Sequence, residues 1–294
     1  MYAAVGDQAR RAWGAGERGR GSRVPELPEV ETIARGLARR LVGRRILAVE
    51  QRRADLRFAL PERLAERLAG RRLLGVDRRA KYILAGLEGG STLLLHLGMS
   101  GRLVLDGAPR GPHEHLTFAF EGGTLLRFVD PRRFGMLDLW PTDRLAEHRL
   151  LRGLGVEPLD RGFDGATLLR LLRGRRVALK TALMDQRLVV GVGNIYANEA
   201  LFRAGLSPRR QAFTVGPERA ARLARAVREV LEEAIAKGGT SLRDYVQANG
   251  ELGSFQGEFR VYDRTGEPCP VCARPIRRIV QGGRASFFCA GCQR

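Results

Sequence analysis

The spacing of hydrophobic residues changes twice along this chain, and the changes divide it into regions. From Pro28 to Gly43 the apolar residues recur every three or four positions, as on a helix with one buried face. Proline suits the first turn of a helix, where its missing N–H group is not needed. The runs that follow are short, and their apolar residues alternate or are continuous. They predict strands at 46–51, 73–79, 82–87 and 92–97, the last buried on both faces.

A hairpin is predicted after these strands. Residues 116–120 alternate between large apolar side chains and smaller ones, Gly122 and Gly123 supply a turn, and 125–129 forms the returning strand. Regularly spaced short strands separated by turn residues favour a β-sandwich or a barrel-like unit. We therefore predict a β-sandwich domain with flanking helices over residues 25–140.

The helical spacing returns beyond Pro141. It predicts helices at 165–172, 176–184, 194–204 and 217–237, with a pair of glycines ending the last. Residues 240–260 are rich in Gly, Asn and Gln, which predicts a mobile loop at the end of a helical domain that spans 141–260. Residues 1–23 lack any periodicity and are rich in arginine, which predicts a disordered extension. With a small C-terminal unit at 261–294, the expected fold class is α+β.

The charge of the chain is strongly unbalanced. Among 294 residues, 51 Lys and Arg face 32 Asp and Glu, for a net charge of +19. Such an excess is typical of proteins that bind a partner with many phosphates. A GC-rich genome would raise the arginine content and explain part of it, but not why acidic residues fail to keep pace. No apolar run reaches 18 residues, so no membrane span is expected.

All four cysteines lie near the C-terminus in two C-x-x-C pairs, Cys269 with Cys272 and Cys289 with Cys292. This spacing is typical of a zinc ribbon, in which four thiolates surround one structural Zn²⁺ and leave no open position for water. Four disulfide-forming cysteines are the alternative, but they would not be paired by spacing at the end of an otherwise cysteine-free chain. Without other cysteines or a secretory signal, we expect a reducing cytoplasm. We also expect a monomer.

Several motifs, in order along the chain, resemble those of formamidopyrimidine-DNA glycosylase, the bacterial enzyme family that excises oxidised purines. The segment 25–32 reads PELPEVET, like the N-terminus of that family, and the resemblance continues to residue 294. The further matching segments are RAKYIL with Lys81, HLGMSG at 96–101, DPRRFG at 130–135, MDQ at 184–186, GVGNIYANE at 191–199 and the ribbon with Arg284. The resemblance implies a bifunctional glycosylase and abasic-site lyase that acts on 8-oxoguanine and formamidopyrimidines in damaged duplex DNA, by a Schiff base and β,δ-elimination.

In that family the N-terminal proline, here Pro25, is the nucleophile. A secondary amine adds to the sugar C1′ and yields an iminium ion directly, and this ion accepts the electrons of the later eliminations. Here 24 residues precede the proline, and an acylated proline nitrogen has no usable lone pair. Val24 can be encoded by GUG, a start codon that is read as Met. We therefore expect translation to begin at position 24 and residues 1–24 to be absent from the mature protein. A cleaved Arg-rich leader is the rival explanation.

The resemblance implies roles for three charged residues near the nucleophile. Glu26 is the general acid, which protonates the ribose ring oxygen. Glu29 is an assisting group or a lesion-pocket residue, but an acid in the first turn of a helix is as often only a partner of the helix dipole. Lys81 is placed at the phosphates that flank the lesion, as a compact positive charge.

The remaining candidates are DNA contacts. Met99, Arg132 and Phe134 resemble the trio that fills the duplex where a nucleotide has been everted, although Met and Phe are more often core residues. Asn194 follows a Gly-rich turn, and we expect it to cap a helix whose free N–H groups bind a phosphate. By resemblance, Arg284 is a phosphate clamp in the ribbon.

Two histidines, His113 and His115, are expected on one face of a strand. They could contact the DNA backbone, and a structural role is the alternative.

Two rival functions stay open at this stage. The first is the sister enzyme endonuclease VIII, which prefers oxidised pyrimidines. Its N-terminal motif has Gly where this chain has Leu27, so the motif favours the purine enzyme. The second is a non-catalytic zinc-ribbon protein that binds damaged DNA while its proline nitrogen is blocked.

Overall fold

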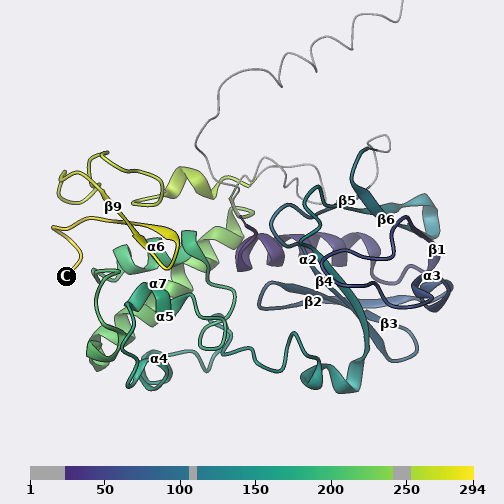
Figure 1. Ribbon diagram of the computed structural model, residues 1–294, viewed down its shortest axis with the longest axis horizontal. Helices are drawn as coiled ribbons and strands as arrows, with labels where there is room; N and C mark the ends of the chain where they lie inside the picture. Colours follow the sequence, from purple (N-terminus) through teal and green to yellow (C-terminus); the bar gives the residue numbers. More distant parts are fainter. Residues whose placement is uncertain (1–23, 106–110, 241–252) are drawn as a thin grey trace, which may run out of the picture.

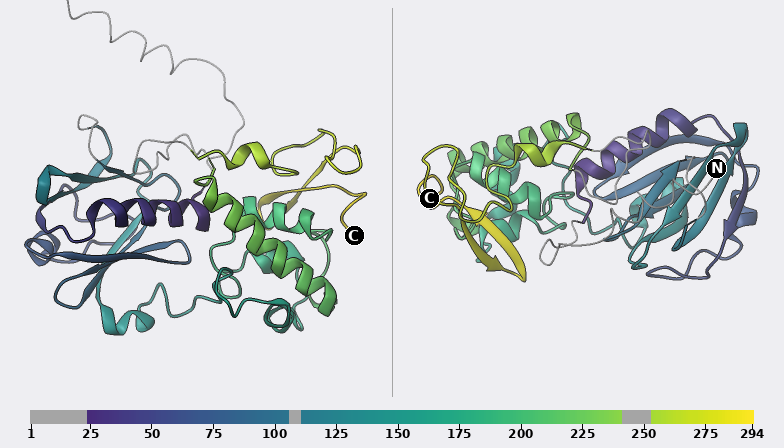
Figure 2. Two further views of the ribbon diagram at one scale, coloured as in Figure 1. Left: turned by 180° about the vertical axis from the view of Figure 1, so that it is seen from behind. Right: turned by 90° about the horizontal axis from the view of Figure 1, so that it is seen from above.

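The computed structural model describes residues 24–105, 111–240 and 253–294. The predicted extension at 1–23 and most of the predicted loop at 240–260 lie outside these ranges. The chain forms two lobes side by side, with the sheets in one and the helices and the C-terminal hairpin in the other (Figure 1). Helix α2, Leu27–Leu41, runs along the sheet lobe and points its N-terminal end at the helical lobe (Figure 2).

Two four-stranded antiparallel sheets form the first lobe. One has the strand order β1-β6-β7-β5 and the other the order β2-β3-β4-β8. A single hydrophobic core includes residues of both sheets and of α2, so the predicted sandwich is confirmed. The bounds are β1 Ile46–Gln51, β2 Leu73–Arg79, β3 Tyr82–Leu87, β4 Ser91–His96, β5 Arg102–Leu105, β6 Glu114–Phe120, β7 Leu125–Val129 and β8 Met136–Pro141, with a short helix α3 at Leu64–Leu68.

The second lobe contains the helices that the apolar spacing predicts. They are α4 Gly165–Leu172, α5 Leu179–Leu183, α6 Asn194–Arg203 and α7 Pro217–Ala236, with a 3₁₀ turn at Ala212–Thr214. A further 3₁₀ turn, Thr142–Glu147, lies against β4 and β8 of the first lobe. The prediction of a helix at 176–184 is wrong at its start. Residues before Leu179 are extended instead, because the carbonyls of Arg175 and Val177 accept hydrogen bonds from the N–H groups of Phe213 and Ala212.

The C-terminal segment packs on the helical lobe and contains a hairpin of β9, Arg277–Gln281, and β10, Arg284–Phe288, which residues 289–294 follow. Part of the predicted loop is ordered structure: Phe255–Glu258 is a 3₁₀ helix, and Phe255 is fully buried against Tyr196. A large apolar side chain anchors this stretch, which explains why its polar composition misled the prediction.

Helix α2 contributes to both hydrophobic cores. Val30 and Ile33 lie in the core of the sandwich, whereas Leu27 is buried in the core of the helical lobe. The Leu27 N–H group donates to the carbonyl of Gly191 over 3.1 Å. Gly191 has a φ of +77°, and a Cβ there would lie 2.5 Å from the Leu27 side chain, so only glycine fits. The first turn of α2 is therefore fixed between the two lobes.

Candidate active site and DNA interface

Glu26 lies at the N-terminal end of α2 and is almost completely buried. Its carboxylate accepts hydrogen bonds from the N–H groups of Gly193 (2.8 Å), Ile195 (3.0 Å) and Tyr196 (3.4 Å), at the start of α6. Burial raises the pKa of the Glu26 carboxyl group above its usual range, although the positive charge of Lys81 opposes this shift. A carboxyl group with a raised pKa keeps its proton to a higher pH than an exposed one, as a general acid requires.

Glu29, one turn further along α2, is held on all sides. One of its oxygens accepts from the Glu26 N–H group at 3.0 Å and completes a capping box. The other accepts from the Tyr196 hydroxyl at 2.6 Å and from the N–H and hydroxyl of Thr240 at 2.8 and 3.0 Å. These bonds tie α2 to α6 and to the end of the described helical segment, so Glu29 has a clear structural task.

The prediction for the Gly-rich turn before α6 is wrong in two respects. Gly193 is the N-cap of α6, and Asn194 is the first helical residue with no side-chain cap. The N–H groups expected to be free for a phosphate are instead bound by Glu26. A Cβ at position 193 would lie 2.3 Å from the Glu26 carboxyl carbon, which explains the glycine. Within the described residues the Asn194 side-chain oxygen has no hydrogen-bond partner.

Lys81 belongs to a two-residue turn between β2 and β3, in which Arg79 pairs with Tyr82. Ala80, the first turn residue, has a φ of +55°, a conformation that favours glycine. The Glu157 carboxylate, from the segment that enters the helical lobe, holds this turn by accepting from the Ala80 N–H group at 2.6 Å. Burial lowers the pKa of Lys81, while the negative charge of Glu26 raises it and Arg284 lowers it. Lys81 therefore lies within the electrostatic reach of both Glu26, which attracts its charge, and Arg284, which repels it.

The three residues predicted to fill the duplex lie on two adjoining loops. Met99 follows β4, and Arg132 and Phe134 precede β8; Phe134 is exposed, with the Arg132 guanidinium 4.8 Å from its ring centre. The loops touch closely, since a Cβ at Gly98 would lie 2.4 Å from the Phe134 backbone. An exposed Phe beneath a guanidinium is not a core residue, so the alternative for Phe134 is excluded.

Asp130 joins these two loops, a task that sequence reasoning missed although the residue lies in the DPRRFG motif. It is fully buried. Its carboxylate accepts from the Ser100 hydroxyl at 2.6 Å on one loop, and from the N–H groups of Gly135 at 2.7 Å and Arg132 at 3.3 Å on the other.

The expectation that His113 and His115 share one face of a strand is wrong. β6 begins at Glu114, and His113 lies before it with a φ of +66°, exposed to solvent. His115 is buried, with its Nε2 2.8 Å from the Asp130 carbonyl. His113 is therefore the member of the pair that can reach a ligand, and His115 supports the loop that carries Arg132.

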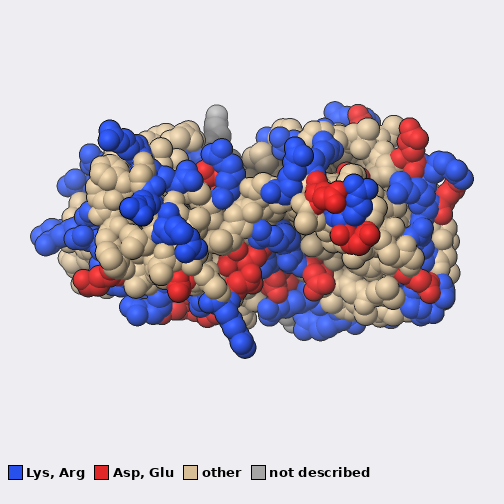
Figure 3. Space-filling model, turned by 90° about the horizontal axis from the view of Figure 1, so that it is seen from below, with Lys and Arg blue, Asp and Glu red and all other residues tan. Residues whose placement is uncertain are grey.

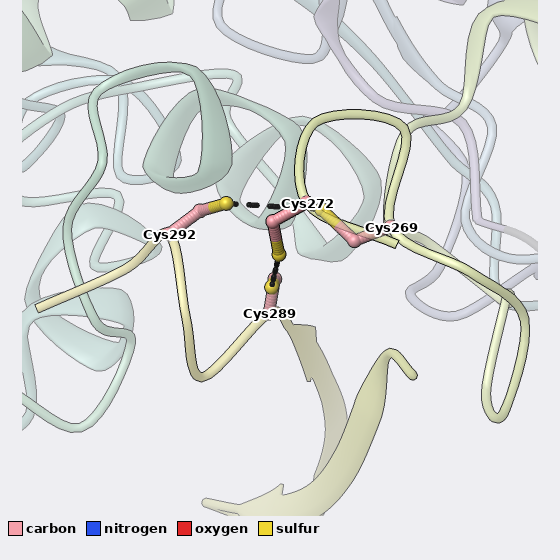
Figure 4. Close-up of side chains that lie close together, drawn as sticks. All are labelled: Cys269, Cys272, Cys289 and Cys292. Carbon is pink, nitrogen blue, oxygen red and sulfur yellow. Dashed lines mark hydrogen bonds between the residues drawn. The ribbon is translucent and has the colours of Figure 1, made fainter. Parts of the chain in front are cut away.

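The four cysteine sulfurs gather at one point between the two knuckles of the ribbon (Figure 4). All lie within 4.8 Å of one another, with 3.8 Å between Cys269 and Cys292 and 3.4 Å between Cys272 and Cys289. Four thiolates around one zinc, each about 2.3 Å from the ion, would lie about 3.8 Å apart. The donor set and its spacing fit one tetrahedral Zn²⁺.

Arg284 is exposed at the start of β10 and borders a cavity of about 510 Å³ that also reaches Lys81 and Gly193. Three further basic residues line it, Arg175, Lys180 and Arg187, with Asp185 as an acidic neighbour. Sequence reasoning assigned none of them a role. Lys180 is buried and donates to the Ala285 carbonyl at 2.7 Å and the Ser286 hydroxyl at 2.8 Å. The sequence did contain a signal for Lys180, because it lies among the apolar positions of the predicted helix, where a lysine is unusual.

His96, within the HLGMSG motif, also received no role. It pairs with Tyr82 across β3 and β4, and its Nδ1 accepts from the Gly98 N–H group at 3.0 Å. Burial, with the charges of Lys81 and Arg57, lowers the pKa of His96 to about 4. The ring is therefore neutral at physiological pH and fixes the start of the loop that carries Met99.

On one face of the molecule the basic residues do not form a single patch (Figure 3). On the face in Figure 3, Lys and Arg side chains are spread over both lobes and are interspersed with acidic ones. The net charge alone therefore does not locate a DNA interface, and the evidence comes from the arrangement around the cavity. In the described residues, none of the helices has the length and apolar character needed to cross a membrane.

Comparison with known proteins identifies all three parts of the chain. Residues 24–137 match the formamidopyrimidine-DNA glycosylase N-terminal domain, residues 154–246 its H2TH domain, and residues 266–294 the zinc finger found in FPG and IleRS. The C-terminal unit is therefore a zinc finger with four cysteines for one structural zinc, as predicted.

Full-length relatives agree with the domain matches. The formamidopyrimidine-DNA glycosylases of Acidiphilium cryptum and Cereibacter sphaeroides are 52% and 54% identical, over 92% of this chain and 100% of theirs. The crystal structure of the MutM (Fpg) protein from Thermus thermophilus superposes with a TM-score of 0.83 at 46% identity, covering 92% of this chain and 98% of that one. The Lactococcus lactis Fpg bound to DNA with an abasic site has a TM-score of 0.84 at 35% identity, covering 92% and 99%. The chain belongs to the formamidopyrimidine-DNA glycosylase family.

Proposed function

We propose that the chain, once its N-terminus is Pro25, is a base-excision-repair enzyme that removes 8-oxoguanine and formamidopyrimidines from duplex DNA and then cuts the strand. Relatives of the same family have been seen with such substrates, including a Lactococcus lactis Fpg variant bound to DNA containing Fapy-dG. The observation that carries the proposal is the placement of Glu26. It is a buried acid with a raised pKa, next to Pro25 and within the electrostatic reach of Lys81.

The chemistry begins at the Pro25 nitrogen, which forms a bond to the sugar C1′ while the bond from C1′ to the base breaks. The base leaves with the electron pair of that bond and takes up the proton that the proline nitrogen loses. Glu26 gives its proton to the ribose ring oxygen, the ring opens, and an iminium ion joins C1′ to Pro25. Loss of a C2′ proton sends electrons into the iminium and expels the 3′ phosphate. In a second elimination, loss of the C4′ proton sends electrons through the conjugated iminium and expels the 5′ phosphate. Water then releases the proline.

The remaining candidates hold the DNA. We assign Lys81, Arg284 and the side-chain amide of Asn194 to phosphates near the lesion. Lys81 and Arg284 border one cavity, and Asn194 adjoins Gly193 on its wall. The assignment of Asn194 excludes the neighbouring N–H groups, because they are bound by Glu26. His113 is exposed and is assigned to the backbone. Met99, Arg132 and Phe134 enter the duplex in place of the everted nucleotide, with Arg132 facing the orphaned base. The proposed setting is the bacterial cytoplasm, on the chromosome.

Borohydride trapping tests the nucleophile. The protein beginning at Pro25 is expected to form a covalent adduct with an 8-oxoguanine·C duplex, because a free secondary amine yields a reducible iminium. The chain that retains Val24 and the preceding residues is expected to form none. Pro28→Ala in the short form is the matched control, since that proline only starts α2, and it should trap normally. An adduct on the long form, with its leader shown intact by mass spectrometry, would reject Pro25 as the nucleophile.

Oxidised pyrimidines form a second substrate class, because a Lactococcus lactis Fpg has also been seen with DNA containing one. Single-turnover excision from 8-oxoguanine·C and thymine-glycol duplexes compares the two. Faster excision of 8-oxoguanine supports the proposal, and the opposite ranking would favour the endonuclease VIII type of specificity.

A further inference from the structure

Asn198 lies in the middle of α6 and is almost completely buried, although its side chain is a polar amide. Its Nδ2 group donates to the Asn194 carbonyl at 2.6 Å, one turn earlier in the same helix. Its Oδ1 atom accepts from the N–H group of Phe287 at 2.7 Å, on β10 of the zinc hairpin. One side chain therefore joins the first turn of α6 to the strand that begins with Arg284.

The orientation of this amide is determined by its two partners. A carbonyl on one side requires the NH₂ group, and an N–H group on the other requires the oxygen, so only one of the two flipped orientations satisfies both. The bond from Nδ2 to the helix prevents the side chain from turning away. As a result, Oδ1 is presented to β10 at a fixed point, and β10 is fixed relative to Asn194.

Other hydrogen bonds also hold this hairpin on the helical lobe, but they come from other elements. Lys180 binds the Ala285 carbonyl and the Ser286 hydroxyl, and Gln281 Nε2 reaches the Pro208 carbonyl at 3.2 Å. Lys180 is on α5, and Pro208 lies after α6. The bond from Asn198 comes from α6 itself, so it relates Arg284 directly to the helix whose N-terminus holds Glu26.

We propose that Asn198 is a positioning residue that sets Arg284 at the right distance from Asn194 and Glu26, so that both phosphate contacts are made at once. This rests on the proposed phosphate contact of Arg284. Asn198 touches neither substrate nor reacting atoms. It acts through β10, because the strand is short and Arg284 lies only three residues before Phe287.

The test is the salt dependence of binding to a duplex with a tetrahydrofuran abasic analogue, measured on the zinc-loaded protein beginning at Pro25. Each phosphate contact contributes about 0.9 to the slope of log affinity against log salt. Arg284→Ala should lower the slope by about one. Asn198→Leu, which is close in size but bonds neither partner, should lower it by the same amount, and the double variant should fall no further.

Gln293→Leu is the matched control. Gln293 is also a buried amide that joins the ribbon to the helical lobe, between the Cys289 N–H group and the Leu206 carbonyl, both at 2.9 Å. Its loss should lower the melting temperature to a similar degree and leave the slope unchanged. If Asn198→Leu loses zinc, Asn198→Ser takes its place, because serine is too short to reach Phe287.

Three results would overturn the inference: an unchanged slope in the Asn198 variant, a further loss of slope in the double variant, or an equal loss in Gln293→Leu. The analogue is not cleaved, so absent excision activity would count against the proposed function and leave this test intact. An unchanged slope in Arg284→Ala alone would reject the Arg284 contact, and with it the basis of the inference.

Discussion

Glu26 and Asp130 are both buried carboxylates that accept hydrogen bonds from backbone N–H groups, but their surroundings differ. Asp130 lies within one lobe and joins two loops that are neighbours in the sandwich. The hydrogen bonds of Glu26 join the two lobes, because they link the start of α2 to N–H groups of α6 that lie 167 to 170 positions away in the sequence. It also lies beside a lysine and a second carboxylate, whose charges act on its pKa.

The difference is the one expected between a structural carboxylate, such as Asp130, and the carboxyl group that we propose as the acid, Glu26. A carboxylate that only organises backbone can be fully satisfied, as Asp130 is by a hydroxyl and two N–H groups. A carboxylate that must also give up a proton needs burial, which favours the protonated form, together with enough hydrogen bonds to tolerate the charge afterwards. Glu199 and Glu29 are two further buried acids that extend the comparison, and substitutions at all four positions test it.

Glu26→Gln, in the form that begins at Pro25, should have the largest effect. Glutamine keeps an acceptor for the α6 N–H groups but has no proton to donate, so excision of 8-oxoguanine should fall by about 10²- to 10⁴-fold. Duplex affinity should change little. Single-turnover excision and anisotropy measure the two quantities, and unimpaired excision would refute the assignment of Glu26 as the acid.

Asp130→Asn should act on stability and on the loops instead. Asparagine has one acceptor oxygen where three donors converge, and a bond to a charged group contributes roughly 1.5–3 kcal/mol. We expect the free energy of unfolding of the sandwich lobe to fall by about 2–3 kcal/mol, as measured by denaturant titration. Asp138→Asn is the control, because the Asp138 carboxylate meets the His148 ring and the N–H group of the next residue, Leu139. Equal losses would contradict a special role for Asp130.

Glu199 provides a pH-dependent test. It is buried on α6 and accepts from the N–H groups of Arg260, Val261 and Tyr262 at 2.8–3.0 Å, where the chain enters the ribbon. Burial raises the pKa of Glu199, so the folded protein holds this proton more tightly than the unfolded chain does. The resulting stability is fully present below the unfolded pKa and is lost as the pH rises through the folded pKa. Relative to Glu199→Gln, the parent should therefore lose stability from about pH 4 upwards, where an unperturbed Glu titrates. The expectation is contradicted if the free energies of unfolding of the parent and of Glu199→Gln differ by a constant amount from acid to neutral pH.

Glu29→Gln should have the smallest effect. Glutamine also completes a capping box, and the Tyr196 hydroxyl can reverse its bond, so only one Thr240 donor loses its partner. We expect a loss of about 1 kcal/mol in stability and excision within about tenfold of the parent. A collapse of excision with stability retained would show instead that Glu29 takes part in the chemistry.

Elements with strong local signals were predictable from the sequence. Strands 46–51, 73–79 and 82–87 have the predicted bounds, because their apolar runs are closed by turns. β5 was not predicted, since four residues with little burial carry no clear period. α5 was predicted too long because the residues before Leu179 bind a distant segment, and no local pattern reports such a partner.

The site follows the same rule. The zinc ligands could be predicted from the sequence because two C-x-x-C pairs are a recognisable signature of a zinc site. The partner of the α6 N-terminus was not predictable, because the carboxyl group that occupies it belongs to Glu26, 167 positions earlier in the chain. Similarly, His113 and His115 were expected together on a strand, but the strand starts only after His113.

Helix α2 is one continuous helix. Its first side chain, Leu27, is buried in the core of the helical lobe, and later ones, such as Val30 and Ile33, are buried in the core of the sandwich. A motion that opened the angle between the lobes would have to remove Leu27 from the core of the helical lobe or bend α2 at its first turn. Either movement would shift Glu26 away from α6. The hydrogen bonds of Glu26 to α6 therefore depend on the packing of the two lobes against each other.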